Sequence, residues 1–434
     1  MKVHLRMLGC RLNQGEIDRM ARQFQQQGHE IVLSPEEADL CIVNTCAVTN
    51  EATVSSRKLV RELHRANPSA RITVTGCYAQ IAPDNIAVLP GVDRVVDNTG
   101  KDTLVEQITG VSVETFDHEP IARDAQAGAM GRTRAFIKVQ DGCDNACTFC
   151  ITTVARGDGR SRSAADVIDE IRGLHAAGYM EVVLTGVHLG SYGHDTGDHD
   201  GLLHLVRAVL NETDVPRVRL SSLEPWDLSS GFFDLWQNPR LCPHLHLPLQ
   251  SGCDATLKRM RRNTDQASFR ALVRAARERI PNVSVTSDVI AGFPGETDDE
   301  FEASIAFIEE MAFAGMHIFR YSKRPGTPAV RMHGHVTEAV KKARSARLHE
   351  LAAGMEADFA ASFIGQHAPV LWEQVSGATE EGFVNIGYTD NYVRARAVYP
   401  RALTNAITES TITGYDAALR QLTVTPVLEP VVME

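Results

Sequence analysis

The sequence predicts an α/β protein in three parts: an N-terminal parallel α/β domain at residues 1–115, a central partial (β/α)6 barrel of the TIM type at 130–365, and a small all-β barrel at 366–434. The first two parts follow from one rhythm, because short apolar runs alternate with helical patterns, as in parallel sheets joined by crossover helices. The third follows from a change after Gly365 to short β-like runs broken by Gly, Asn and Asp, which is typical of small closed barrels.

The N-terminal domain consists of four apolar runs, each followed by a helical pattern. The predicted strands lie at residues 3–8, 38–43, 71–75 and 94–96, and the predicted helices at 14–28, 51–66, 78–89 and 101–108. Residues 114–132 contain acidic residues, Gly and Ala and are only weakly periodic, so they predict a linker.

The central domain has six apolar runs, each separated from the next by a stretch long enough for a helix. These strands lie at residues 135–140, 181–184, 217–220, 244–247, 283–290 and 316–321. Six β/α units predict an open barrel rather than a closed one. A long helix at 337–363 precedes the β-like runs of the third domain, at 369–373, 383–386, 392–398 and 422–427.

Length, charge and hydropathy exclude several classes of protein. The chain of 434 residues is 43% hydrophobic and 23% charged, so it can bury a large core and is unlike a disordered protein. Its net charge of −11 excludes a basic surface for indiscriminate nucleic-acid binding but is compatible with a local basic path. The sequence has neither an apolar run of membrane-spanning length nor an N-terminal export signal, so we expect a cytoplasmic protein without membrane contact.

The most specific motif is a cysteine cluster directly after the first strand of the central domain. Cys143, Cys147 and Cys150 have the spacing C-x3-C-x2-C, so one loop presents three thiolates. Thiolates suit iron–sulfur clusters or zinc, and three of them without a fourth ligand nearby leave one metal position open. The alternative interpretation is a zinc knuckle or three chance core cysteines, which the specificity of the spacing disfavours.

A second group of cysteines is dispersed along the N-terminal domain. Cys10, Cys46 and Cys77 each follow a predicted strand directly. Because the carboxyl ends of parallel strands share one edge of a sheet, these thiols should converge there as a second open cluster site. The alternative is that each is a small buried hydrophobe. Partners at ligand spacing are lacking for the other three cysteines, which are interpreted as structural: Cys41, Cys242 and Cys253.

With these cysteines, the chain resembles the radical S-adenosylmethionine (SAM) methylthiotransferases along nearly its whole length. Besides both cysteine groups, the matching segments are KVQDGC (138–143), CTFC (147–150), LTGV (184–187), HLPLQSG (246–252), LKRMRR (257–262), DVIAGFPGET (288–297) and YSKRPGTP (321–328). The residues from 366 onward are similar to the TRAM domain, an RNA-binding β-barrel.

The family has branches that act on isopentenyladenosine in tRNA, on threonylcarbamoyladenosine in tRNA, and on an aspartate of a ribosomal protein. The segments LGCRLNQ (8–14), NTCAVT (44–49), KVQDGC and YSKRPGTP resemble the threonylcarbamoyladenosine branch most closely. One departure is ITTVAR at 151–156, where the family more often has Ile-Pro or Val-Pro after the last cysteine. It leaves the ligands untouched and puts the family's local loop shape in question.

The resemblance implies methylthiolation of C2 of N6-threonylcarbamoyladenosine at tRNA position 37, a C–H bond that acid–base chemistry does not readily attack. It implies two 4Fe–4S clusters and no catalytic residue beyond their ligands. The cluster at Cys143, Cys147 and Cys150 would cleave SAM to the 5′-deoxyadenosyl radical, and the cluster at Cys10, Cys46 and Cys77 would supply or carry the methylated sulfur. A second SAM would donate the methyl group, so both open sites should face one cavity.

Four residues at strand ends of the central barrel are predicted to contact SAM: Gly186, Glu224, Gln250 and Ser251. The alternative is that each merely caps a strand or a turn.

Three groups of residues are predicted to contact a tRNA anticodon loop, through phosphate contacts and base stacking. They are Lys258, Arg259, Arg261 and Arg262; Lys341, Lys342, Arg344 and Arg347; and Tyr388, Asn391, Tyr392, Arg394 and Arg396 of the last domain. The alternative is that the basic runs are solvated faces. An electron donor such as flavodoxin or ferredoxin and a source of sulfur are further implied partners.

Two rival functions are compatible with the sequence. The first keeps the radical chemistry but takes isopentenyladenosine or the ribosomal-protein aspartate as substrate. The second is a non-catalytic iron–sulfur RNA-binding sensor, which would form no 5′-deoxyadenosine from SAM.

Overall fold

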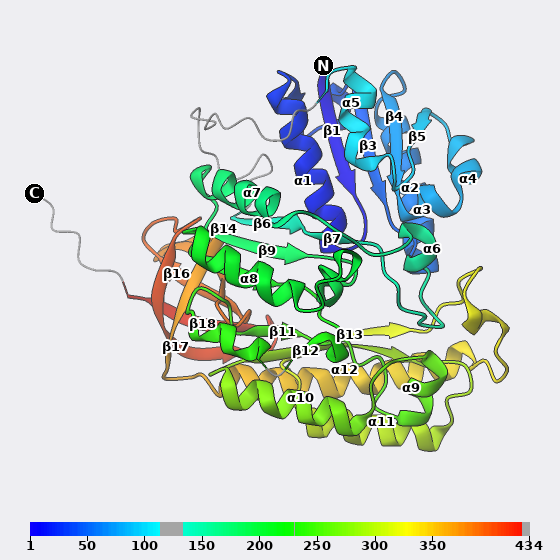
Figure 1. Cartoon of the computed structure of the whole chain (residues 1–434). Helices are drawn as coiled ribbons and strands as arrows, with labels where there is room; N and C mark the ends of the chain where they lie inside the picture. The colour runs from blue at the N-terminus through cyan, green and yellow to red at the C-terminus, as the bar shows by residue number, and fades with distance from the viewer. Residues whose placement is uncertain (113–132, 230, 428–434) are drawn as a thin grey trace, which may run out of the picture.

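The computed structural model describes residues 1–112, 133–229 and 231–427, and it confirms the predicted α/β class and its three parts (Figure 1). The predicted linker at 114–132 lies outside the described residues. The exact limits of the three domains stay a prediction.

The N-terminal domain is a sheet of five parallel strands in the order β2-β1-β3-β4-β5. Every residue of β3 is buried, as expected of a central strand whose two faces are both covered. In chain order the elements are β1 (Lys2–Met7), α1 (Arg11–Gln26), β2 (Glu30–Ile31), β3 (Leu40–Thr45), α2 (Asn50–Ala66), β4 (Arg71–Gly76), α3 (Cys77–Ile81), α4 (Pro83–Ala87), β5 (Val92–Val95) and α5 (Leu104–Thr109).

Two details of this domain differ from the prediction. The helix predicted at 78–89 is the pair α3 and α4, because Pro83 has no backbone N–H to continue a helical ladder and instead begins the second helix. The edge strand β2 is absent from the prediction, since its two residues carry no periodicity.

The core is the predicted open barrel, with six strands in the order β6-β9-β10-β11-β12-β13. Parallel ladders join the strands within each half, and a parallel bridge between Ser222 and His246 is one of those that connect the halves. In chain order the elements are β6 (Arg134–Lys138), β7 (Gln140–Asp141), α6 (Thr152–Arg156), β8 (Arg160–Ser161), α7 (Ala164–Ala176), β9 (Glu181–Thr185), α8 (Gly201–Glu212), β10 (Arg217–Leu220), β11 (His244–His246), α9 (Asp254–Met260), α10 (Gln266–Arg279), β12 (Ser284–Ala291), α11 (Asp298–Met311), β13 (Gly315–Arg320) and α12 (Glu338–Ala361).

Capping side chains fix where several of these helices begin. Asp265 and Thr297 each accept a hydrogen bond from the backbone N–H three residues later, and the side chain at that position bonds back, which makes a capping box on α10 and on α11. Thr337 caps α12 in the simpler way, through its hydroxyl.

The two faces of the core sheet differ in polarity. Val182, Val218 and Leu245 belong to the apolar cluster that packs under the helices. Their strand neighbours Glu181 and Arg219 therefore point to the opposite face, which we call the inner face. A barrel of this kind places its reactive groups on that face and at the carboxyl ends of its strands.

The C-terminal domain is a closed barrel in the order β14-β15-β16-β18-β17, with Trp372 fully buried in its centre. Its strands are β14 (His367–Thr379), β15 (Gly382–Thr389), β16 (Arg394–Tyr399), β17 (Ile407–Asp416) and β18 (Gln421–Pro426). The prediction lacks β17, because half of its sequence ITESTITGYD is Thr, Ser and Gly and it gives little apolar alternation.

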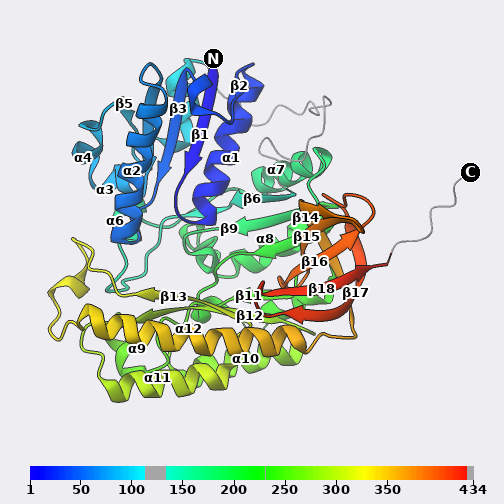
Figure 2. The same cartoon turned by 180° about the vertical axis from the view of Figure 1, so that it is seen from behind.

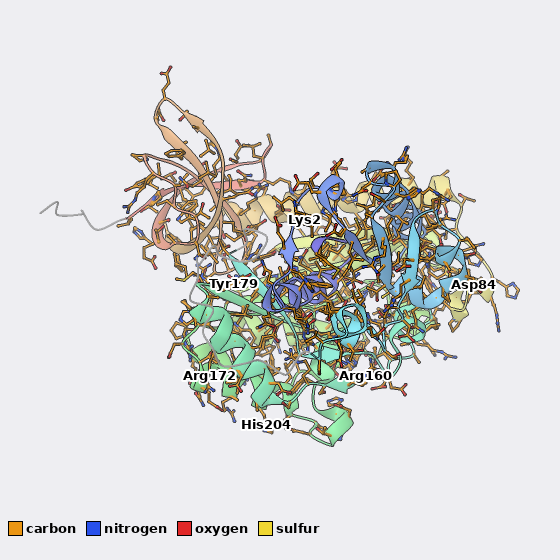
Figure 3. All side chains as sticks on the ribbon, turned by 90° about the horizontal axis from the view of Figure 1, so that it is seen from above. Lys2, Asp84, Arg160, Arg172, Tyr179 and His204 are labelled. Atoms are coloured by element: carbon orange, nitrogen blue, oxygen red, sulfur yellow. The ribbon has the colours of Figure 1, made fainter. Side chains whose placement is uncertain are left out.

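The N-terminal domain packs on the edge of the core through α1. A Cβ atom at Gly15 would lie 2.6 Å from the backbone oxygen of Phe136, so α1 can approach β6 this closely only because residue 15 is glycine. Figure 2 shows the N-terminal sheet above β6, with the C-terminal barrel beside the core. Seen from above, Tyr179 lies on the side of the C-terminal barrel, and Asp84 marks the far end of the N-terminal domain (Figure 3).

The turn between β15 and β16 docks the C-terminal barrel onto the amino ends of the core strands. Arg219 donates to the backbone oxygen of Asp390 at 2.8 Å, and its guanidinium lies 4.7 Å from the centre of the Tyr392 ring. The same arginine pairs with Glu181 at 2.7 Å. Burial opposes ionisation of Glu181, but Arg219 and its neighbouring arginines lower its pKa to about 2.

Replacing Arg219 with methionine should therefore loosen the barrel from the core. The change removes the main partner of the buried Glu181 carboxylate and the hydrogen bond to Asp390 of the barrel. We therefore expect the free energy of unfolding to fall by about 3–5 kcal/mol. Urea unfolding of the full chain measures it, with the exposed Arg207→Met on α8 as control. Equal unfolding midpoints for the two variants would contradict the assigned role.

Candidate functional site

Cys143, Cys147 and Cys150 lie in the loop between β7 and α6, at the carboxyl end of the first core strand. All three are partly exposed. The loop is held by backbone bonds, including Cys143 N–H to the oxygen of Gly157 at 3.0 Å. Gly142 has φ +76°, and a Cβ there would lie 1.8 Å from the oxygen of Asp158, so the loop requires glycine.

A buried arginine lies against this trio. Arg262 is 8% exposed, and its Nη1 donates to the sulfur of Cys147 at 3.7 Å. Its Nη2 pairs with Glu224 at 2.5 Å, and its guanidinium covers the Trp226 ring at 4.5 Å. Burial raises the pKa of the Cys147 thiol to about 11, and Arg262 opposes that shift because it stabilises the thiolate.

His188 is a second buried group beside the trio. Its Nε2 lies 2.5 Å from the carboxylate of Asp227, its Nδ1 lies 3.3 Å from the amide nitrogen of Asn145, and Cys143 is close enough to act on it electrostatically. Burial alone would lower the pKa of His188, but the bond to Asp227 and the contact with Cys143 raise it to about 10. An imidazolium and a guanidinium therefore both face the cysteine loop.

Cys10, Cys46 and Cys77 follow three neighbouring strands, β1, β3 and β4. Thr45 pairs with Gly76 in the ladder, so Cys46 and Cys77 occupy equivalent positions at the sheet edge. A Cβ at Gly9 would lie 2.8 Å from the sulfur of Cys46, so the chain leaves room around this thiol. Cys10 and Cys77 both act electrostatically on Cys46, whose pKa burial raises to about 11.

Both trios fit the ligand set of an open iron–sulfur cluster. Within each trio the thiols lie close enough to act on one another electrostatically, and Gly9 keeps a side chain away from the sulfur of Cys46. Thiols whose pKa is raised stay protonated until a metal replaces the proton, as is usual for such ligands. Cys41 and Cys242 are buried in the interior, as expected of structural cysteines, and Cys253 is 9% exposed at the start of α9.

The two trios lie on neighbouring elements. The helix that begins at Cys77, α3, packs against α6, which follows Cys150, and both views show them together (Figures 1 and 2). The segment 151–156, whose sequence departs from the family pattern, lies at this contact. It forms the short helix α6, and its last residue, Arg156, is buried.

A buried network of charges joins the N-terminal domain to the core at this place. Glu16 of α1 pairs with Lys101 at 2.8 Å and Arg156 at 3.0 Å, and lies 3.6 Å from Lys138. Asp141, two residues before Cys143, pairs with Arg156 at 2.9 Å. Burial disfavours the charge on Glu16, but three cations lower its pKa well below the usual range. Lys101 faces one carboxylate and a nearby arginine, so burial prevails there and lowers its pKa.

Known proteins resemble this chain along most of its length. Residues 2–97 match the model of the uncharacterized protein family UPF0004, and residues 137–308 match the radical SAM superfamily. A threonylcarbamoyladenosine tRNA methylthiotransferase MtaB of Bacillus subtilis (strain 168) is 38% identical over 89% of this chain and 88% of its own length. A protein of the same name from Thermotoga maritima is 38% identical over 90% of each chain. The chain belongs to the radical SAM methylthiotransferase family.

Other similar proteins fit this membership. A tRNA-2-methylthio-N(6)-dimethylallyladenosine synthase of Oceanobacillus iheyensis is 33% identical over 95% of this chain and 82% of its own length. The radical SAM methyltransferase TsrM of Kitasatospora setae has the same fold, with a TM-score of 0.57 at 17% identity over 76% of each chain. No helix among residues 1–112, 133–229 and 231–427 of this methylthiotransferase combines the length and apolarity needed to cross a bilayer.

The residues predicted to contact SAM divide into two pairs in this methylthiotransferase. The first pair lies near the core trio. A Cβ at Gly186 would lie 3.0 Å from Oε1 of Gln140, whose amide group donates to the backbone of the Cys143 loop. Glu224 pairs with Arg262 beside Cys147. Gln250 and Ser251 lie farther along, in the turn after β11, where the Ser251 hydroxyl accepts a bond from Cys253 N–H. Their roles toward SAM stay a prediction.

Most residues predicted to contact RNA are paired inside the methylthiotransferase. Lys341 and Arg344 are buried, and Arg344 pairs with Glu296 at 2.6 Å, so the basic face predicted on α12 is wrong for these two residues. Exposed Arg347 pairs with Glu302, and Arg259 pairs with Glu300. Exposed cations of the two runs remain at Lys258, Arg261 and Lys342.

The predicted stacking platform of the C-terminal barrel is also wrong in part. Asn391 is buried and donates to the backbone oxygen of Asn282, and Tyr388 and Tyr392 stack on each other under Arg134 of the core. These side chains hold the domain interface, because the turn that carries them is the docking turn. Arg394 stays exposed and Arg396 partly exposed on β16.

The sequence reasoning missed several site residues. His188 directly follows LTGV, and His246 is the first residue of HLPLQSG, so the sequence offered a signal for both. Their neighbours in space, Asp227 and His317, carry no motif of their own, and only the fold brings them together.

Proposed function

We propose that this methylthiotransferase adds a methylthio group to C2 of N6-threonylcarbamoyladenosine at position 37 of tRNA. The observation that carries the proposal is the contact between α3, which begins at Cys77 of one trio, and α6, which follows Cys150 of the other, beside the buried ion pairs of Arg156 with Glu16 and Asp141. Relatives named for threonylcarbamoyladenosine, at 38% identity over about nine-tenths of the chain, support this substrate over isopentenyladenosine.

Two 4Fe–4S clusters and SAM are the proposed cofactors. Cys143, Cys147 and Cys150 would hold one cluster, and Cys10, Cys46 and Cys77 the other, each with an open iron. With SAM bound, these groups supply the radical that attacks the C–H bond and the sulfur that replaces the hydrogen.

The chain's own residues set the electrostatics of the site. Arg262 and protonated His188 place two positive charges beside the core trio, which favours the thiolate form of its cysteines. Asp227 holds His188, and Glu224 holds Arg262, so neither cation is free to turn away. The Glu16 network fixes the distance between the two trios, because it is anchored on both domains.

Replacing Arg262 with methionine tests this electrostatic role. Loss of a buried positive charge beside an anionic cluster disfavours its reduced form, and each 1.4 kcal/mol corresponds to about 60 mV for a one-electron couple. We expect the reduction potential of the core cluster in the holoenzyme to become more negative by about 60 mV or more. Lys258→Met, exposed on the preceding helix α9, is the control; a potential unchanged in both variants would refute the role.

The proposed partners are the tRNA anticodon loop, an electron donor such as flavodoxin or ferredoxin, and a source of sulfur. Lys258, Arg261, Lys342 and Arg394 are exposed cations available for phosphate contacts. We place the enzyme in the cytoplasm, where these partners would meet it.

Mass spectrometry of tRNA nucleosides and ribosomal proteins from a deletion strain separates the substrates. Loss of 2-methylthio-N6-threonylcarbamoyladenosine, restored by this gene, is the expected result. Loss of the methylthiolated isopentenyladenosine, or of the modified ribosomal aspartate, would replace the proposed substrate by a rival.

A non-catalytic iron–sulfur sensor is the rival of another class. It predicts no 5′-deoxyadenosine when the reconstituted, reduced protein is given SAM, whereas the enzyme must form it. The buried cations beside an open cysteine trio favour the enzyme, since a sensor has no need of a substrate position.

A further inference from the structure

Three side chains of adjacent strands meet on the inner face of the core. His246 of β11, Asp288 of β12 and His317 of β13 present ligand atoms that all lie within 4.8 Å of one another. The Nε2 atom of His246 is 3.2 Å from the Asp288 carboxylate, and its Nδ1 is 2.9 Å from the hydroxyl of Thr286. His317 is exposed, so the group opens to the inner face. We call His246, Asp288 and His317 the inner triad.

An arginine of the N-terminal domain reaches the same place. The guanidinium of Arg11 donates to the Tyr392 hydroxyl at 2.6 Å and lies 4.9 Å from the centre of that ring. The Tyr392 ring lies 5.0 Å from that of His244, which shares Thr286 with the inner triad. The protein packed around the ring lowers the pKa of His317 by desolvation, although part of the side chain reaches solvent. Asp288 opposes this shift and Arg11 lowers the pKa further, so the cation acts on the triad.

Arg11 has unused hydrogen-bonding capacity. Within the described part of the chain it has no carboxylate partner, unlike Arg134, Arg217 and Arg219 of the same face, which pair with Glu373 or Glu181. A partly buried guanidinium without a carboxylate is a fitting partner for the carboxylate of a ligand.

An aromatic ring lies next to the triad on the same strand face. Phe319 is 41% exposed and two residues after His317, so the two side chains point the same way about 7 Å apart. Residue 319 is nearer the carboxyl end of β13, the end at which the core trio lies. An exposed ring of this kind suits stacking with a base.

We infer that Phe319, the inner triad and Arg11 form the seat of the substrate adenosine and its N6 substituent, with Arg11 and His317 donating to the threonyl carboxylate and urea oxygen and Asp288 accepting from the threonyl hydroxyl. The inference rests on the proposed function and names the residues that would distinguish this substrate from an apolar isopentenyl group. An apolar substituent would displace water from Arg11 and Asp288 without offering either one a hydrogen-bond partner in its place, and a site built for polar groups rejects such analogues strongly.

A divalent cation is the competing occupant of the inner triad, since two imidazoles and a carboxylate are possible zinc ligands. The positive charge of Arg11 beside His317 disfavours it. Metal analysis of the holoenzyme decides the matter: zinc that is present with the iron and lost in His317→Ala would overturn the inference.

The main experiment pairs variants with substrate analogues. Anticodon stem-loops carry threonylcarbamoyladenosine, the same nucleoside with its carboxylate as an amide, or glycylcarbamoyladenosine without the hydroxyl side chain. We expect Arg11→Met to lower kcat/KM on the natural stem-loop by roughly 10- to 100-fold, the size of a lost charge-assisted hydrogen bond. On the amide analogue, kcat/KM of the wild type should fall by the same factor, and kcat/KM of Arg11→Met should be no lower than that of the wild type. Asp288→Asn should show the same relation to the glycyl analogue.

The controls separate this inference from the proposed function. Arg274→Ala, exposed on α10, should behave as wild type. Because Arg11 directly follows Cys10, its replacement could also disturb the fold around the cluster ligands. Formation of 5′-deoxyadenosine and the iron content measure such a defect, and both should stay at wild-type values in Arg11→Met. Equal losses on the natural and amide stem-loops would overturn the seat alone. Wild type that cleaves SAM yet never methylthiolates the natural stem-loop would remove the proposed function, and the seat with it.

Discussion

Alanine at Cys143, Cys147 and Cys150 together will abolish the formation of 5′-deoxyadenosine from SAM, and alanine at the N-terminal trio will not. The core trio lies where the first strand of the open barrel ends, between two buried cations. The N-terminal trio lies on a different sheet, on three strands of its own. The two sites should therefore fail independently.

The second half of this prediction concerns the product. Alanine at Cys10, Cys46 and Cys77 should leave SAM cleavage in place and remove the methylthiolated nucleoside. Iron should fall from about eight to about four per chain in either triple variant. Chromatography of the nucleosides and a colorimetric iron assay measure both results. The control variant Cys253→Ala should keep both SAM cleavage and methylthiolation. If the triple variant at Cys10, Cys46 and Cys77 also lost SAM cleavage, the two clusters would not be independent.

Replacing Glu16 with glutamine will cause a large loss of stability at the domain interface, although the two side chains have nearly the same shape. Its carboxylate is 3% exposed and faces Lys101, Arg156 and Lys138, so neutralising it leaves three buried cations with too few partners. Breaking a buried ion pair costs about 3–5 kcal/mol. Glu62→Gln, whose exposed partner is Lys58, should cost about 0.5 kcal/mol or less.

The pH dependence of this network has a definite sign. The pKa of Glu16 is lower in the folded protein than in the unfolded chain. Its contribution to the free energy of unfolding is therefore complete above the pKa that it has in the unfolded chain. The contribution is lost as the pH falls toward the folded pKa. Urea midpoints of wild type should therefore drop in acid more steeply than those of Glu16→Gln, and parallel curves would contradict the assignment.

Much of the fold and the cysteine sites can be predicted because their determinants are local. Cys46 and Cys77 directly follow apolar runs, and neighbouring parallel strands end at one edge, so their proximity follows from topology. The break in the helix at Pro83 was equally local and needed only the missing N–H to be considered.

The RNA contacts were harder to predict because charge in a sequence does not reveal its partner. Arg344 and Arg262 lie in basic runs, yet acidic residues far along the chain, Glu296 and Glu224, neutralise them in the interior. Tyr392 has the composition of a base-stacking residue, but the fold of the last domain turns it toward the core. Such pairings depend on the tertiary structure, which periodicity does not encode.

The hydrogen bond between Arg11 and Tyr392 has a practical consequence for dividing this enzyme into pieces. A chain cut ahead of β14 would lose Tyr392, the hydrogen-bond partner of Arg11, together with the whole C-terminal barrel. Fragments of this enzyme would therefore have an altered interdomain interface, and they would not behave as independent domains.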